Sequence, residues 1–394
     1  PRLGEGGEAD WTPPPAPVGN GEAPAEVLAG VRVVDFGMFL AGPMGPSMMG
    51  DMGADVIKVE ALTGDRIRFM HRYYQAASRS KRSIALDLTR PEAEPILARL
   101  LGWAEAVHHN MRFKGAAKLG LSDEGIRRHN PTIAFNYVSA YGQRGSRGNW
   151  PGYDSIFNAI AGWEFENAGE GNKPMFNRPG TMDVSSAQSA LVELMASLYA
   201  RRSGQRGYTT QTSLLGISAL TQGETLILPD GSLADTHHLT ADQTGFSPWH
   251  RIYQCSDGKW IAVAAHTDAR RTALRGVLGG DETGFEAQTA SRTSADVLAA
   301  LEAAGVPCDR VTFEAAEDQF FANPHYRDMG LISVLEQPLY GTVEQPGAFW
   351  HFGDMPIVFR HAAPAIGQHT DEIMRELGFS DAEIADYREK KVIG

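Results

Sequence analysis

Several features that would direct a protein to a membrane, a metal or a secreted fold are scarce in this sequence. It contains only two cysteines, Cys255 and Cys308, which lie far apart and form no metal-type spacing. Two reduced thiols in a protein of the cytoplasm are the expected state. No apolar run reaches the roughly 18 residues that a membrane span needs. No basic and apolar leader resembling a signal peptide is present either. The sequence therefore predicts a cytoplasmic protein without a membrane partner or a metal site.

Positive charge is also in the minority. The chain has 36 Lys and Arg against 48 Asp and Glu, which gives a formal net charge of −12. Such a balance argues against broad binding to nucleic acids or membrane surfaces, although local basic clusters can still bind a small anion. The glycines at positions 37, 42 and 45 do not spell GxGxxG, so no nicotinamide cofactor is expected.

The 394 residues are too many for one compact core, so two domains are expected. Residues 1–24 are rich in Pro, Gly and Glu, a composition typical of a linker or flexible arm. From Leu28 onward the pattern changes. A strand over Val31–Phe36, a Met-rich helix over Pro46–Met52 and a strand over Asp55–Val59 predict a parallel α/β sheet.

Further elements follow from the same periodicities. Strands are predicted at 84–88, 104–108 and 131–138, and helices at 91–101 and 155–163. Farther along lie a hairpin over 249–265, helices over 268–305 and around 315–321, strands at 331–334 and 342–344, and a helical tail over 370–391.

The segment RPGTMDVSSAQSALVELMASLYARRSGQRG, residues 178–207, carries the most informative pattern. Its apolar residues recur at the spacing of one helical face, at Ala187, Leu191, Leu194 and Leu198. Asp183 stands at the predicted helix start, where free backbone N–H groups and the helix dipole keep a carboxylate ionised. Such an Asp is either an N-cap or a nucleophile, and locally an N-cap is far commoner.

Six segments together resemble the class III (CaiB/BaiF-type) CoA-transferase family, the group of L-carnitine CoA-transferase and formyl-CoA transferase. They are VRVVDFGMFLAGPMGPSMMGDMGADVIKVE, SKRSIALDL, NMRFKGAAKLGL, the Asp183 segment, RIYQCSDGKWIAVA and IGQHTDEIMRELG. Each is weak alone, but all six occur in the family's order from about Leu28 to Gly394.

The resemblance implies a function. In the family, the Asp that matches Asp183 attacks an acyl-CoA thioester, and CoA then passes through an aspartyl thioester to a carboxylic acid. The resemblance places coenzyme A, as the acyl-CoA substrate, near Lys81, Arg82, Asn110, Met111, Arg112, Lys118, Ala41, Tyr153 and Asp154. It also implies an interlocked homodimer. Its fold would be α/β: a large Rossmann-like domain from 25–210 and a returning segment 341–394, plus a smaller α+β domain over 225–340.

Departures from the family narrow the choice of reaction. Leu40 stands where the formyl-CoA enzyme has Gln, and no glycine-only loop follows residue 239, which disfavours oxalate and formate. The related α-methylacyl-CoA racemases need a His where this chain has Tyr153. Asp154 either lines the pocket or caps the helix that follows. A non-catalytic CoA-binding half of a tandem protein is a further alternative, suggested by the linker-like first residues.

Overall fold

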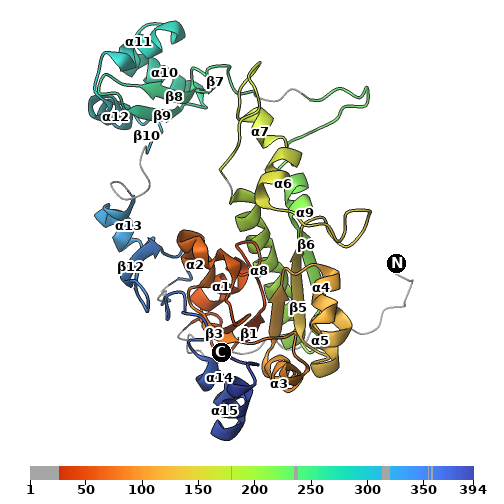
Figure 1. The fold of residues 1–394 in the computed structure, drawn as a ribbon. Helices are drawn as coiled ribbons and strands as arrows, with labels where there is room; N and C mark the ends of the chain where they lie inside the picture. Colours follow the sequence, from red (N-terminus) through yellow and green to blue (C-terminus); the bar gives the residue numbers. More distant parts are fainter. Residues whose placement is uncertain (1–25, 179, 235–237, 313–319, 354, 356–357) are drawn as a thin grey trace, which may run out of the picture. The chain divides into compact units, whose positions relative to one another are not determined.

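The computed structural model describes residues 26–178, 180–234, 238–312, 320–353, 355 and 358–394. The predicted linker and most of the helix predicted around 315–321 lie outside these residues. The chain forms two compact units (Figure 1). The first, here called the sheet unit, contains the described residues up to Pro151 together with Asp183–Ser213 and Gly330–Gly394; the second unit contains Gly152–Met182 and Leu214–Met329. These boundaries differ from the expected ones, because residues 152–182 group with the second unit.

The sheet unit is built on six parallel strands. They are β1 (Arg32–Asp35), β2 (Asp55–Glu60), β3 (Arg82–Ala85), β4 (Ala106–His109), β5 (Ala134–Ser139) and β6 (Thr209–Ser213). Their order in the sheet is β3-β2-β1-β4-β5-β6, and every neighbouring pair is parallel. The chain thus builds outward from β1 to β3, then returns beside β1 and builds in the other direction. The predicted parallel α/β sheet is confirmed.

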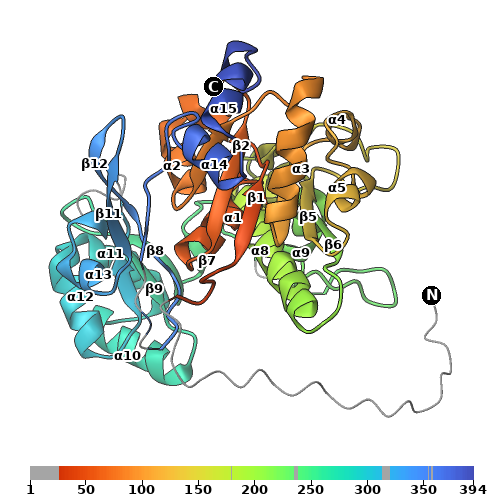
Figure 2. The same ribbon diagram turned by 90° about the horizontal axis from the view of Figure 1, so that it is seen from below.

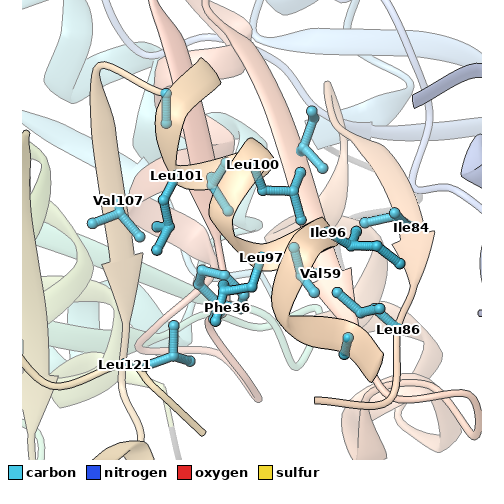
Figure 3. Close-up of a cluster of buried hydrophobic side chains, with 14 of the residues drawn as sticks. Phe36, Val59, Ile84, Leu86, Ile96, Leu97, Leu100, Leu101, Val107 and Leu121 are labelled. Carbon is cyan, nitrogen blue, oxygen red and sulfur yellow. The ribbon is translucent and has the colours of Figure 1, made fainter. Parts of the chain in front are cut away.

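Helices cover both faces of this sheet because consecutive apolar residues of a strand point to opposite faces, and both faces must be shielded from water. Val34 and Ile57 face one core with α3 (Glu94–Trp103), α5 (Asp123–His129), α14 (Thr370–Glu376) and α15 (Asp381–Glu389). Figure 3 shows Leu97, Leu100 and Leu101 of α3 packed over Phe36 and its neighbours. Val33 and Val56 face the opposite core with α1 (Met44–Asp51) and α8 (Thr181–Arg202).

The last residues of the chain extend the sheet beyond β3. Leu86 pairs antiparallel with Ile393, and the Asp87 N–H donates to Val392 O at 2.8 Å. Helix α14 contacts β3 and α15: Figure 1 shows it next to β3, and Figure 2 shows it next to α15. The strand predicted at 84–88 therefore begins and ends earlier, as β3. Its parallel pairing with β2 ends at Glu60 and Ala85, and the next residue, Leu86, pairs with Ile393 instead. A hairpin of β11 (Ile332–Gln337) and β12 (Gly341–Pro346) completes this segment.

The second unit has its own core. Strands β7 (Gly245–Ser247), β8 (His250–Gln254), β9 (Trp260–Ala264) and β10 (Cys308–Arg310) form an antiparallel sheet in the order β10-β9-β8-β7. The predicted hairpin corresponds to β8 and β9. Ile261 and Val263 pack with Leu274, Phe285 and other residues of α10 (Asp268–Leu278), α11 (Phe285–Ala290) and α12 (Ser294–Ala303).

The remaining elements are short. They are η1 (Arg66–Phe69), α2 (His71–Ser78), η2 (Pro91–Ala93), α4 (Phe113–Lys118), α6 (Asp154–Ile160), α7 (Trp163–Glu166), α9 (Leu214–Leu220), η3 (Glu282–Gly284) and α13 (Pro324–Asp328). Among the described residues, no helix combines the length and the apolar character that crossing a membrane requires.

Candidate active site

The strand order itself points to one edge of the sheet. β1 and β4 are neighbours, but the chain continues from β1 to β2 toward one edge strand and from β4 to β5 toward the other. Open α/β sheets bind ligands outside the carboxyl ends of their strands at such a switch point. The turn Gly37–Pro43 follows β1 at this edge, and Asn110 follows β4.

Asn110 fixes the turn after β1. Its Oδ1 accepts a hydrogen bond from the Met38 N–H at 2.8 Å, and its Nδ2 donates to Met38 O at 2.7 Å. The turn lies so close that a Cβ built on Gly42 would be 2.5 Å from Asn110 Cγ. Phe39 adopts a left-handed backbone, with φ of 59°. Two loops from neighbouring strands therefore form one rigid corner.

Polar side chains form a continuous row under this corner, on the face toward α1 and α8. In register across the sheet they are Ser83, Lys58, Asp35, His108, Asn136 and Thr210, one from each strand. All except Thr210 are buried. His108 Nδ1 lies 2.9 Å from Asn136 Oδ1, and Asn136 Nδ2 donates to Glu193 Oε2 at 2.5 Å. Burial lowers the pKa of His108 below its ordinary value, which favours a neutral imidazole.

The basic pair Lys81 and Arg82 is engaged inside the protein. Lys81 is fully buried, and its Nζ lies 2.7 Å from Asp35 Oδ2 and donates to Pro43 O and Ala77 O. Burial lowers the pKa of Lys81 to about 8, and the Asp35 carboxylate opposes that shift. Arg82 pairs with Asp55 at 2.6 Å and with Glu372 and Glu376 of α14. With these partners, neither side chain offers a free cation to a CoA phosphate.

A cavity of about 220 Å³ opens at the same edge. It lies between the carboxyl ends of β1, β2, β3 and β4, and its wall is mostly apolar. Its lining residues are Phe36, Gly37, Met38, Lys58, Val59, Glu60, Ala61, Gly64, Asp65, Leu86, Asp87, Leu88, Thr89, Met111 and Leu119.

Several predicted residues lie at or beside this cavity. Met111 contributes to the wall, and Lys118 directly precedes the lining residue Leu119. Arg112 and Lys118 are exposed at the two ends of α4, so both are available to an anion. Ala41 is buried within the turn. Among Lys81, Arg82, Arg112 and Lys118, the last two are the exposed ones, and their contact with CoA stays a prediction.

Asp183 lies near the same turn. Helix α8 begins at Thr181, so Asp183 is its third residue rather than its cap. The side chain is half-buried, and its backbone carbonyl accepts from Ser186 Oγ at 2.8 Å. Val184 packs against the cluster that contains Leu40 of the turn. A carboxylate in the first helical turn interacts favourably with the helix dipole, which suits an ionised nucleophile.

The close approach of α1 to α8 holds this arrangement. A Cβ on Gly45 of α1 would lie 2.9 Å from the Ala187 carbonyl oxygen, so only glycine allows the two helices to pack this tightly. Helix α8, which carries Asp183, therefore packs closely against the helix that follows the turn Gly37–Pro43.

Tyr153 and Asp154 belong to the second unit. Asp154 is the first residue of α6, not its cap, and its Oδ1 accepts from Asn158 Nδ2 at 2.6 Å. Tyr153 is 61% exposed. Their contribution to the Asp183 site stays a prediction.

Sequence reasoning missed Lys58 and Asp65, which contribute to the cavity wall and form a buried ion pair of 3.1 Å. The available signal was a lysine between Ile57 and Val59 in the buried strand DVIKVE, because a buried lysine almost always has a charged partner.

Comparison with known proteins identifies the family of the chain. Residues 28–370 match CoA-transferase family III. The succinyl-CoA–L-malate CoA-transferase beta subunit of Chloroflexus aurantiacus is 26% identical, over 93% of this chain and 98% of that protein. The succinate–glutarate CoA-transferase of Agrobacterium fabrum is 27% identical, over 89% and 95%. A CAIB/BAIF family protein from Brucella suis superposes with a TM-score of 0.78 at 23% identity, covering 89% of this chain and 99% of that one. The chain therefore belongs to the family III CoA-transferases, enzymes that act on acyl-CoA.

Proposed function

We propose that the protein transfers CoA from an acyl-CoA thioester to a carboxylic acid, with Asp183 as the covalent carrier. The observation that supports this most directly is the position of Asp183. Asp183 lies in the first turn of α8, and its neighbour Val184 packs against the apolar cluster that contains Leu40 of the turn Gly37–Pro43. Met38 of the same turn lines the cavity. In this proposal the nucleophile and the pocket for the ester would be positioned by the same turn.

The proposed first half-reaction transfers CoA to the enzyme and forms a thioester with Asp183. An Asp183 oxygen attacks the thioester carbonyl carbon, the C–O bond forms, the C–S bond breaks, and CoA leaves as thiolate. The thiolate then attacks the Asp183 carbonyl carbon of the resulting anhydride and displaces the donor acid as a carboxylate. Asp183 now carries CoA as a thioester.

The second half-reaction is the reverse with the acceptor acid. The acceptor carboxylate attacks the Asp183 thioester carbonyl, forms an anhydride and releases CoA thiolate. The thiolate attacks the acceptor's carbonyl carbon, which yields the new acyl-CoA and restores the Asp183 carboxylate. No proton is consumed in either half, so the site needs an ionised carboxylate and no general acid.

CoA itself would bind along the carboxyl edge of the sheet. The mostly apolar cavity suits the adenosine portion, and the exposed Arg112 and Lys118 beside it suit the phosphates in a protein whose net charge is −12. Asn110 and Ala41 would contribute through the turn they help to form.

The decisive experiment traps the enzyme intermediate. The protein is incubated with acyl-CoA and hydroxylamine, and mass spectrometry should find a hydroxamate at Asp183. Asp183→Ala should abolish CoA exchange and keep CoA binding. Asp381→Ala, which removes an exposed first-turn aspartate of α15, is the matched control and should exchange at the parent rate. Parent-rate exchange by Asp183→Ala would refute the proposal.

The relatives suggest which substrates to test first. Two are named for succinyl-CoA, with L-malate or D-citramalate, and one for succinate and glutarate. Succinyl-CoA is therefore the first donor to assay against a panel of dicarboxylic acids. A racemase would instead exchange the α-proton of a 2-methylacyl-CoA for deuterium, and Tyr153 in place of the His of that branch disfavours this outcome.

We also propose that the active protein is a homodimer in the cytoplasm. The strongly exposed apolar side chains of Val192 and Tyr199 on α8, 67% and 76% exposed, support a partner surface. Light scattering should give twice the mass of one chain. A mass of one chain for an active enzyme would contradict the dimer, and an active homodimer would remove the non-catalytic alternative.

A further inference from the structure

Two buried lysines approach the turn Gly37–Pro43 from beneath, one at each end. Lys58 Nζ donates to Gly37 O at 2.8 Å, and Lys81 Nζ donates to Pro43 O at 2.5 Å. Neither side chain is exposed to solvent. Both therefore use a charged donor on a backbone carbonyl of the same short turn.

The two aspartates that neutralise these lysines contact the turn as well. Asp35 pairs with Lys81 and accepts from the Gly37 N–H at 2.7 Å. Asp65 pairs with Lys58 and accepts from the Phe39 N–H at 3.3 Å. Each ion pair thus offers the turn one donor and one acceptor.

Stability alone is a weak reason for this arrangement. Taking two charges out of water costs about as much as their mutual attraction returns, so apolar residues of similar size commonly do as well. Charged donors with fixed geometry do something that apolar side chains cannot, because they specify where a backbone carbonyl lies. The turn needs this, since Phe39 holds a left-handed backbone that is unfavourable for a bulky residue.

The turn in question forms part of the ligand cavity. Gly37 and Met38 line it, and Leu40 belongs to the apolar cluster against which Val184, the neighbour of Asp183, packs. Movement of the turn would therefore alter the cavity wall and the surroundings of the nucleophile at the same time.

We propose that Lys58 and Lys81 are positioning residues, which hold the turn Gly37–Pro43 in its binding conformation before the CoA ester arrives. The ligand part of this inference rests on the proposed CoA-transferase function. Neither lysine touches the ligand through its ammonium group in this role. Their effect is preorganisation: a free protein with an already ordered turn loses less conformational entropy on binding.

The test neutralises each pair rather than breaking it. Asp35→Asn combined with Lys81→Met removes both charges, and Asn keeps the oxygen that accepts from the Gly37 N–H. Asp65→Asn combined with Lys58→Met attacks the other end of the turn. The matched control is Asp51→Asn with Arg79→Met, because that pair is also buried and its arginine also donates to backbone carbonyls, those of Pro346 and Gly347.

Two readouts are needed. Hydrogen exchange of the amides over residues 37–42 should become roughly tenfold faster in either paired variant, the factor expected when one charge-assisted hydrogen bond is lost. The Kd for free CoA, measured by calorimetry, should rise by a similar factor. The control should change neither quantity, whatever it does to the melting temperature.

The outcomes separate the two claims. Parent-like exchange and parent-like CoA affinity in the folded paired variants would overturn the positioning role. Loss of cooperative unfolding in both paired variants, with the control folded, would also overturn it, because the lysines would then serve the whole fold. If the parent protein fails to bind CoA, the proposed function fails, while the exchange data still decide whether the lysines hold the turn.

Discussion

Replacement of Gly42 by alanine tests the corner between β1 and β4 with a single methyl group. The added Cβ would lie 2.5 Å from Cγ, 2.6 Å from Oδ1 and 2.8 Å from Nδ2 of Asn110. These distances are below van der Waals contact, so the amide must move. Moving it breaks both hydrogen bonds that Asn110 makes with Met38.

The expected cost follows from those two bonds and the lack of space. Each hydrogen bond contributes about 0.5–1.5 kcal/mol net. Overpacking of a tight site costs about 1–3 kcal/mol. Gly42→Ala should therefore lower the free energy of unfolding by about 2–6 kcal/mol. It should also weaken CoA binding, since Met38 is part of the cavity wall.

Urea unfolding and CoA calorimetry measure the two effects. Gly102→Ala is the matched control: it makes the same chemical change in α3, where a Cβ meets nothing within 4 Å, and should stabilise by up to about 1 kcal/mol. In an Asn110→Ala background, Gly42→Ala should cost less than half as much as in the parent, because the clashing amide is gone. An equal cost in both backgrounds would refute the reasoning.

Two further predictions concern stability. Burial by itself raises the pKa values of Asp35 and Glu60, but Lys81 and Arg68 respectively outweigh it and hold them below their ordinary 3.8 and 4.5. The ionised carboxylates therefore stabilise the fold above these ordinary pKa values, and this stabilisation is lost as the pH falls below them toward the lower pKa values of the folded protein. The melting temperature should decrease below about pH 4.5, and it should decrease less steeply in Glu60→Gln. An equal pH dependence of the melting temperature in Glu60→Gln and the parent would contradict this. Leu100→Ala, at a fully buried site, should cost about 2–5 kcal/mol in urea unfolding, whereas Leu339→Ala, 67% exposed, should cost under about 0.5.

The sequence predicted well whatever depends on local periodicity. Short apolar runs identified β1 and β2, and the helical face from Ala187 to Leu198 identified α8. Element ends were less certain, because they depend on distant partners. The helix containing Asp183 starts two residues earlier than expected, and β3 ends early because residues near Ile393 take over its pairing.

Partners far along the chain explain what was not predictable at the site. The cluster of Arg79, Lys81 and Arg82 looks like a basic surface in one dimension. In the structure Lys81 meets Asp35, 46 positions away, and Arg82 meets Glu376, 294 positions away. A pattern within a short stretch of sequence cannot reveal ion pairs between residues so far apart along the chain. Asn110 and Met111, by contrast, follow β4 at the carboxyl edge of the sheet, a location that depends only on a loop that follows a strand.

The pairing of the C-terminal residues with β3 has a consequence for how the protein is made. The Ala85 N–H donates to Thr370 Oγ1 across 285 positions, and Gly394 N–H donates to Ala85 O. During translation, the edge of the sheet next to β3 stays unpaired until the second unit and the C-terminal residues have been synthesised. Contacts of such long range are slow to form, and an open strand edge invites aggregation in the meantime. Recombinant production should thus benefit from slow translation or chaperones, which protect that edge until its last partner emerges.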